Sequence, residues 1–197
     1  MTLYIRHIIH RTIGLLLLLI TLGTGAVWGQ TNITSLSDIT NADGHYVITQ
    51  DITGGIPVVT TFNGTLEADI DPTTHMPYKI TGLSAPLFTT LTGTVKNLVF
   101  DNVSINTSSG NTGAIACSAE SSARIYNVGI LSGSIGGTAY TGGLVGLLKE
   151  SARVVNCYSF ATITGGTNVG GIVGYNNEST ASNNLQTMVF ACMFYGK

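Results

Sequence analysis

Few charged residues in this sequence could bind or act on an acidic polymer. The candidates are four bases and three acids in the middle of the chain: Lys79, Lys96, Arg124, Arg153, Asp101, Glu120 and Glu150. A polysaccharide lyase or glycosidase needs carboxylates that converge on the substrate, or a basic residue beside a metal. A carbohydrate-active enzyme, or a fragment of one, therefore requires these side chains to share one face of the fold.

Four of these residues recur at nearly matched positions. Glu120 and Arg124 are followed by Glu150 and Arg153, 30 and 29 residues later. The spacing predicts a charged stripe along one edge of the protein. This stripe is either a solvated turn with weak surface ion pairs, which we favour, or a ridge that contacts a glycan. Arg124, Arg153, Glu120 and Glu150 are accordingly the candidate ligand contacts.

The sequence lacks the familiar catalytic and metal-binding motifs. It has neither a Gly-x-Ser-x-Gly nucleophile elbow nor a His-Glu-x-x-His zinc-protease motif. The four histidines, His7, His10, His45 and His75, do not cluster with cysteines in a zinc pattern. We therefore predict no catalytic residues, no cofactor and no bound metal, and we expect a protein that is not an enzyme.

A polar cluster lies in the least repetitive part of the chain, residues 53–82. Its members surround an Asp-Pro step: Asp69, Asp71, Thr73, Thr74 and His75. Their spacing lacks the ligand pattern of a calcium loop such as the EF-hand. We predict a solvated turn here in preference to a cation site.

The three cysteines, Cys117, Cys157 and Cys192, do not define a disulfide framework, because their number is odd and their spacing irregular. Cys157 and Cys192 are expected on adjacent coils, within reach of a disulfide. We favour buried free thiols that pack as small apolar groups, and leave that disulfide open.

A repeat sets the position of all these residues. Gly142, Gly143, Leu144 and Gly146 return 28 residues later as Gly170, Gly171, Ile172 and Gly174, and the repeat is clearest over residues 112–176. A second motif places Asn97, Asn127 and Asn156 in one register, each two residues after an aliphatic side chain. A last copy at 189–192 fits if polar residues near 178–184 form a longer turn, and it has Ala191 at the asparagine position.

Short alternating runs between Gly, Asn, Ser and Thr predict strands that cannot bury their apolar side alone. Three-sided units stacked in parallel can bury that apolar side against one another. We therefore predict an all-β fold: a right-handed parallel β-helix (β-solenoid) of about five coils. The paired glycines would form tight corners, through positive φ or close backbone approach. The expected inward ladders are Val95/Ile125/Val154/Val189 and Leu87/Ile115/Leu144/Ile172, and the asparagines are expected to form an amide ladder.

The motifs resemble those of the GLUG-repeat proteins. The family core appears as Gly143-Leu144-Val145-Gly146 and Gly171-Ile172-Val173-Gly174, and further family segments appear as Asn156-Cys157-Tyr158 and within 44–52, 62–66 and 87–98. The resemblance implies a secreted or surface-attached bacterial protein, typical of Bacteroidota, with a stalk or adhesin-like role. Related repeats occur in IgA-protease-type polypeptides, and the family offers no catalytic residues to transfer.

The N-terminal segment predicts export. Arg6, His7, His10 and Arg11 precede an apolar run at 13–22, which indicates a signal peptide over residues 1–29. That run is too short to span a membrane, so no transmembrane segment is expected after cleavage, and the protein is expected to be secreted or at the cell surface, outer-membrane-associated or extracellular. Removing Arg6 and Arg11 leaves 8 − 2 = 6 bases against 10 acids, which excludes the basic face of a nucleic-acid-binding protein.

The remaining chain divides into an N-terminal cap and the β-helix. Residues 30–44 carry Ile33, Leu36 and Ile39 at a spacing of three, which predicts a short helical turn over the first coil. The β-helix is predicted at 45–197, with its first strand at 45–52. No polar capping unit follows Val189, so self-association or further repeats are expected through the last coil.

These observations favour a non-catalytic module, adhesin-like or a structural stalk, whose partner is a host or dietary glycan or glycoprotein. The alternative is a fragment of a carbohydrate-active β-helix enzyme.

Overall fold

The computed structural model describes residues 29–57, 59–177 and 187–197. The predicted signal peptide therefore lies outside the described residues except for Gly29, and so does the longer turn predicted near 178–184. No helix in the described ranges has the length and apolar character of a membrane span.

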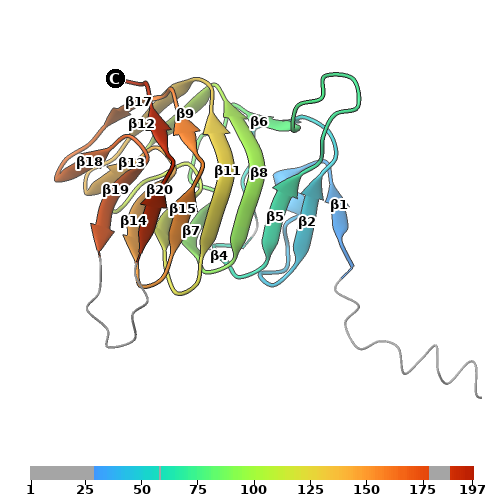
Figure 1. The fold of residues 1–197 in the computed structure, drawn as a ribbon, viewed down its shortest axis with the longest axis horizontal. Coiled ribbons are helices and arrows are strands. Elements are labelled where there is room, and N and C mark those ends of the chain that lie inside the picture. Colours follow the sequence, from blue (N-terminus) through green and yellow to red (C-terminus); the bar gives the residue numbers. More distant parts are fainter. Residues whose placement is uncertain (1–28, 58, 178–186) are drawn as a thin grey trace, which may run out of the picture.

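The main sheet is built from parallel strands that follow one another along the coil axis (Figure 1). Its path is β1 (Thr31–Ile33), β2 (His45–Ile48), β5 (Thr65–Ala68), β8 (Thr94–Asp101), β11 (Arg124–Ile130), β15 (Arg153–Val155) and β20 (Met188–Phe190). Four shorter strands extend it: β3 (Ile52–Thr53), β6 (Lys79–Thr81), β16 (Tyr158–Ser159) and β21 (Met193–Phe194).

Three further parallel sheets complete the coil. The second contains β4 (Thr61–Phe62), β7 (Phe88–Leu91), β10 (Ala116–Ala119), β14 (Val145–Lys149) and β19 (Val173–Asn177). The third contains β9 (Val103–Asn106), β12 (Gly133–Gly136) and β17 (Thr162–Thr164), and β13 (Tyr140–Gly142) pairs with β18 (Asn168–Gly170) as a short fourth side. The predicted parallel β-solenoid is confirmed, with about four turns and a short side beyond the three expected; its handedness stays a prediction.

The repeat register is also confirmed. Val95, Ile125, Val154 and Val189 are direct partners on successive strands. The first three are at most 1% exposed, whereas Val189 is 41% exposed because no described strand covers it. The second ladder, Leu87/Ile115/Leu144/Ile172, is buried throughout, next to the paired residues of β7, β10, β14 and β19. Both ladders fill the interior of the coil, where each rung packs on the next.

The predicted asparagine ladder exists. Asn127 Nδ2 donates to Asn97 Oδ1 at 3.1 Å, and Asn156 Nδ2 donates to Asn127 Oδ1 at 2.8 Å. All three residues have φ between 52° and 56°, a left-handed conformation that asparagine tolerates better than most residues. Each one lets its strand turn so that side chains on both sides of it, such as Ile125 and Val128, point inward.

The paired glycines serve close backbone approach rather than positive φ. Gly142 and Gly170 are partners, and neither has a left-handed φ. A Cβ on Gly142 would lie 2.1 Å from the Val145 carbonyl oxygen, and one on Gly170 would lie 1.9 Å from that of Val173. The corner is therefore closed by backbone packing that only glycine permits.

The N-terminal segment differs in part from its prediction. Ser35 caps a 3₁₀ turn at Leu36–Asp38, and Leu36 and Ile39 are fully buried against the first coil. A strand, β1, precedes this turn because Ile33 continues the inward alternation. The predicted first strand at 45–52 is divided into β2 and β3, and between them the Asp51 carboxylate accepts the Lys79 backbone N–H at 3.0 Å.

Candidate ligand-binding face

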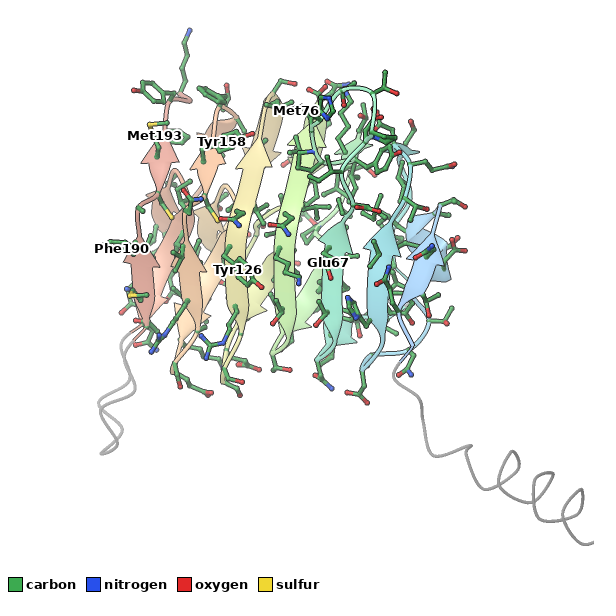
Figure 2. All side chains as sticks on the ribbon, turned by 45° about the vertical axis from the view of Figure 1, so that its right-hand side comes forward. Glu67, Met76, Tyr126, Tyr158, Phe190 and Met193 are labelled. Carbon is green, nitrogen blue, oxygen red and sulfur yellow. The ribbon has the colours of Figure 1, made fainter. Side chains whose placement is uncertain are left out.

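The outer face of the main sheet carries the candidate functional side chains. One outward column crosses five strands and changes character along the coil: Glu67, Lys96, Tyr126, Val155 and Phe190. Figure 2 shows Glu67, Tyr126 and Phe190 at one height on this face, with Met76, Tyr158 and Met193 nearer the end of the strands. The face is thus charged toward the N-terminal coils and aromatic toward the C-terminal ones.

Glu67 is the centre of a charged group that sequence reasoning missed. Its Oε1 lies 2.7 Å from His45 Nε2, and its Oε2 lies 2.9 Å from Lys96 Nζ. Burial raises the pKa of Glu67, but the hydrogen bonds and charges of Lys96 and His45 outweigh it and hold the pKa below its ordinary value. Glu67 therefore stays ionised near neutral pH. Its 29-residue offset from Lys96 was the signal that could have revealed the pair.

Two further ion pairs, which include the candidates Lys79, Asp101 and Glu120, lie in separate places on the coil. Lys79 Nζ lies 3.1 Å from Asp101 Oδ2, and Lys149 pairs with Glu120. A hydrogen bond from Ser132 and the Lys79 ammonium lower the pKa of Asp101. The structure therefore distributes these side chains into isolated ion pairs instead of one convergent site.

The predicted ridge is brought together only in part. Arg124 and Arg153 are direct partners on β11 and β15. Glu120 points to Lys149, and Glu150 Oε2 accepts the Ser121 backbone N–H at 2.7 Å. A shallow groove of about 320 Å³ lies over the arginines, lined by Arg124, Ile125, Tyr126, Asn127, Arg153, Val155 and Met188.

The Asp-rich segment forms a loop that stands over the face (Figure 1, upper right). Ile70 and Pro77 form an antiparallel bridge across its base. The Asp71 carboxylate accepts the Thr73 backbone N–H at 2.8 Å and the Thr74 hydroxyl at 2.9 Å, and these bonds lower its pKa. Within the described ranges no group of three His, Cys, Asp or Glu side chains is arranged to hold a metal.

A groove of about 310 Å³ opens between this loop and the sheet. We call it the Tyr158 groove; its lining residues are Asp51, Asp71, Thr74, Met76, Pro77, Lys79, Val99, Leu131 and Tyr158. The Tyr158 ring lies on Gly129, where an added Cβ would be 2.0 Å from the ring carbon Cζ. Burial raises the pKa of the Tyr158 hydroxyl, so it stays protonated. The groove combines a flat aromatic wall with a few charged groups.

Exposed aromatic rings continue from the Tyr158 groove toward the last described strands. The Tyr158 and Phe160 ring centroids are 5.7 Å apart, and those of Phe160 and Tyr195 are 5.8 Å apart. Phe160 and Tyr195 are 43% and 67% exposed. Exposed apolar groups gathered in this way mark interaction surfaces more often than scattered ones do.

The cysteines are free in the structure, and Cys157 and Cys192 are neighbours as predicted. Cys157 is buried, whereas Cys192 is partly exposed. The neighbouring Cys157 thiol lowers the pKa of Cys192 to about 6, and Cys192 together with burial raises the pKa of Cys157. Cys192 is thus the thiol of this pair that ionises first.

Comparison with known proteins gives a family similarity over part of the chain. A family model described as M26 IgA1-specific Metallo-endopeptidase N-terminal region matches residues 40–132. The matched range contains Glu67, Lys96 and Arg124 and stops before Arg153 and Tyr158. No curated protein and no solved structure shows a significant match.

Proposed function

We propose that this chain is a non-catalytic recognition module of a secreted or cell-surface bacterial protein, and that its ligand is a glycan or the glycan of a glycoprotein. The similarity to a region described as N-terminal in an IgA1-specific metallo-endopeptidase family supports a module that accompanies other domains outside the cell. The GLUG-type motifs and the signal-peptide pattern of the sequence support the same location.

The Tyr158 groove is the observation that carries the proposal. Small-ligand sites are concave and largely apolar, with a few polar groups that fix orientation. Here Tyr158 offers a ring face, Met76 and Leu131 supply apolar walls, and Asp51 and Lys79 supply polar groups. An aromatic face packs well on the C–H side of a sugar ring, and charged groups at the rim can bond its hydroxyls.

The carboxylates of the Tyr158 groove support binding rather than hydrolysis. A glycosidase general acid needs a raised pKa, whereas the pKa of Asp71 is lowered and both its oxygens hold the loop. One oxygen of Asp51 accepts the Lys79 backbone N–H. The carbohydrate-active enzyme fragment remains the alternative function, and the following experiment separates the two.

The purified chain is incubated with a panel of glycans and glycoproteins, and bound and free ligands are analysed by mass spectrometry. We expect retention of a chemically unchanged ligand, which Tyr158→Ala abolishes. Tyr140→Ala is the matched control, because Tyr140 lies on a different side of the coil, where its ring centroid is 4.8 Å from that of Tyr175. Ligands with new chain ends would establish the enzyme instead, and an absence of retention across the panel would refute the proposal.

A further inference from the structure

Two arginines occupy adjacent positions on the outer face of the main sheet. Arg124 and Arg153 are direct partners on parallel strands, and such strands lie about 4.8 Å apart. Like charges in directly opposed positions destabilise a sheet. The column continues through Thr94 and Met188, which carry no charge. The pair therefore works against folding unless an anion binds to it.

No described carboxylate neutralises this pair. Each of three lysines in the described ranges has its own acid: Lys79 with Asp101, Lys96 with Glu67 and Lys149 with Glu120. The acids nearest in sequence to the arginines bond elsewhere, as Glu120 meets Lys149 and Glu150 meets the Ser121 backbone. Among the described residues, neither Arg124 nor Arg153 has a carboxylate oxygen within 4.0 Å.

The surroundings of the pair suit a chain-like ligand. The shallow groove over Arg124 and Arg153 is walled by Tyr126 and Met188. Tyr126 points outward on β11 between Arg124 and Gly129, on which the Tyr158 ring lies. At about 3.3 Å per residue, the five-residue step from Arg124 to Gly129 spans about 16 Å. Figure 2 shows Tyr158 and Tyr126 on this face. A polymer seated on Tyr158 can therefore pass Tyr126 and reach the arginines along β11.

We infer that Arg124 and Arg153 form a subsite for an anionic substituent, a carboxylate or a sulfate ester, of a polysaccharide bound along this face. The inference rests on the proposed glycan-binding function and names the class of glycan. Guanidinium forks bind planar and tetrahedral oxyanions through paired hydrogen bonds. A nucleic acid would need a continuous basic track, whereas the same face carries Glu67, Asp51 and Asp71.

The test measures binding of the full chain to three polymers with one backbone: dextran, carboxymethyl-dextran and dextran sulfate. A DNA duplex is added as the competing class of polyanion. Arg124→Gln/Arg153→Gln is compared with Lys149→Gln/Lys197→Gln, which also removes two positive charges, but from positions on or beside the second and third sheets, away from the binding face. Thermal unfolding of each variant is recorded, and the arginine variant should not unfold earlier than the wild type, because a like-charge contact is removed.

We expect an anionic dextran to bind about tenfold or more tightly than dextran, and the arginine variant to lose that preference while the lysine variant keeps it. The carboxymethyl and sulfate arms tell which anion is preferred. Equal binding of all three dextrans, equal loss in both variants, or arginine-dependent binding of DNA at similar strength would overturn the inference. If the arginine test fails while the glycan panel still shows Tyr158-dependent retention, the anionic subsite is refuted and the proposed function stands. If the anionic dextrans bind through the arginines without any contribution from Tyr158, the Tyr158 groove is refuted and the anionic subsite stands.

Discussion

The asparagine ladder offers a quantitative test of what holds the coils in register. Asn156→Ala removes a side chain that tolerates φ of 52° and an amide that donates to Asn127 Oδ1 at 2.8 Å. A left-handed conformation costs an ordinary residue about 1 kcal/mol, and a neutral hydrogen bond contributes about 0.5 to 1 kcal/mol. We therefore expect Asn156→Ala to lower the free energy of unfolding by about 1.5 to 2 kcal/mol.

Two companion variants separate these contributions in urea unfolding. Asn156→Gly accepts the positive φ but cannot donate, so it should lose about 1 kcal/mol, less than the alanine variant. Ala191 occupies the next position of the ladder with φ of 51° and no amide, so Ala191→Asn should gain about 1 kcal/mol. No loss for either variant at Asn156, together with no gain at Ala191, would show that the ladder accompanies the register without stabilising it.

The remaining predictions concern Tyr158, the thiols and acid stability. Gly129→Ala should displace the Tyr158 ring, since its Cβ would lie 2.0 Å from that ring, and abolish glycan retention with an unchanged circular dichroism spectrum; retained binding would contradict this role. Iodoacetamide should alkylate Cys192 before Cys157 at pH 7, and the rate at Cys192 should fall when the pH is lowered below the Cys192 pKa of about 6. Mass-spectrometric mapping that finds Cys157 modified first would refute this prediction. The folded-state pKa of Glu67 is lowered, so the stability that its ionised form contributes is present above its unfolded pKa and is lost as the pH falls through the folded pKa. Glu67→Gln should therefore reduce the loss of urea resistance on acidification. An unchanged dependence of urea resistance on pH would argue against this prediction.

Much of the fold was predictable because the repeat fixes register by residue type. Val95, Ile125 and Val154 recur at offsets of 30 and 29 residues, and a solenoid turns equal offsets into direct strand partners. The asparagine ladder was equally predictable, since few other residues combine a tolerated positive φ with a side-chain amide that can hydrogen-bond along the stack. The strand β1, which ends at Ile33, was missed because a single inward side chain is too short a pattern to indicate a strand.

The binding face was less predictable, because it depends on residues outside the repeated motifs. Arg124 and Arg153 could be placed side by side from their spacing, but the partners of Glu120 and Glu150 depend on side-chain directions in the turns. The Tyr158 groove needs the loop at 69–77 to stand over the sheet, and this loop has no counterpart one repeat away.

Partners along β5, β8, β11 and β15, and along β7, β10, β14 and β19, are 28 to 30 residues apart, which has a consequence for how such a protein changes length. In these coils each rung closes a loop of nearly the same number of residues, so the entropy lost on closure is nearly the same for every added repeat. Inserting one repeat of 29 residues would displace everything beyond it by one strand spacing, about 4.8 Å, without moving the outer face to another side of the coil. The number of repeats can therefore set how far a given position on the outer face lies from the first coil, independently of what the face binds.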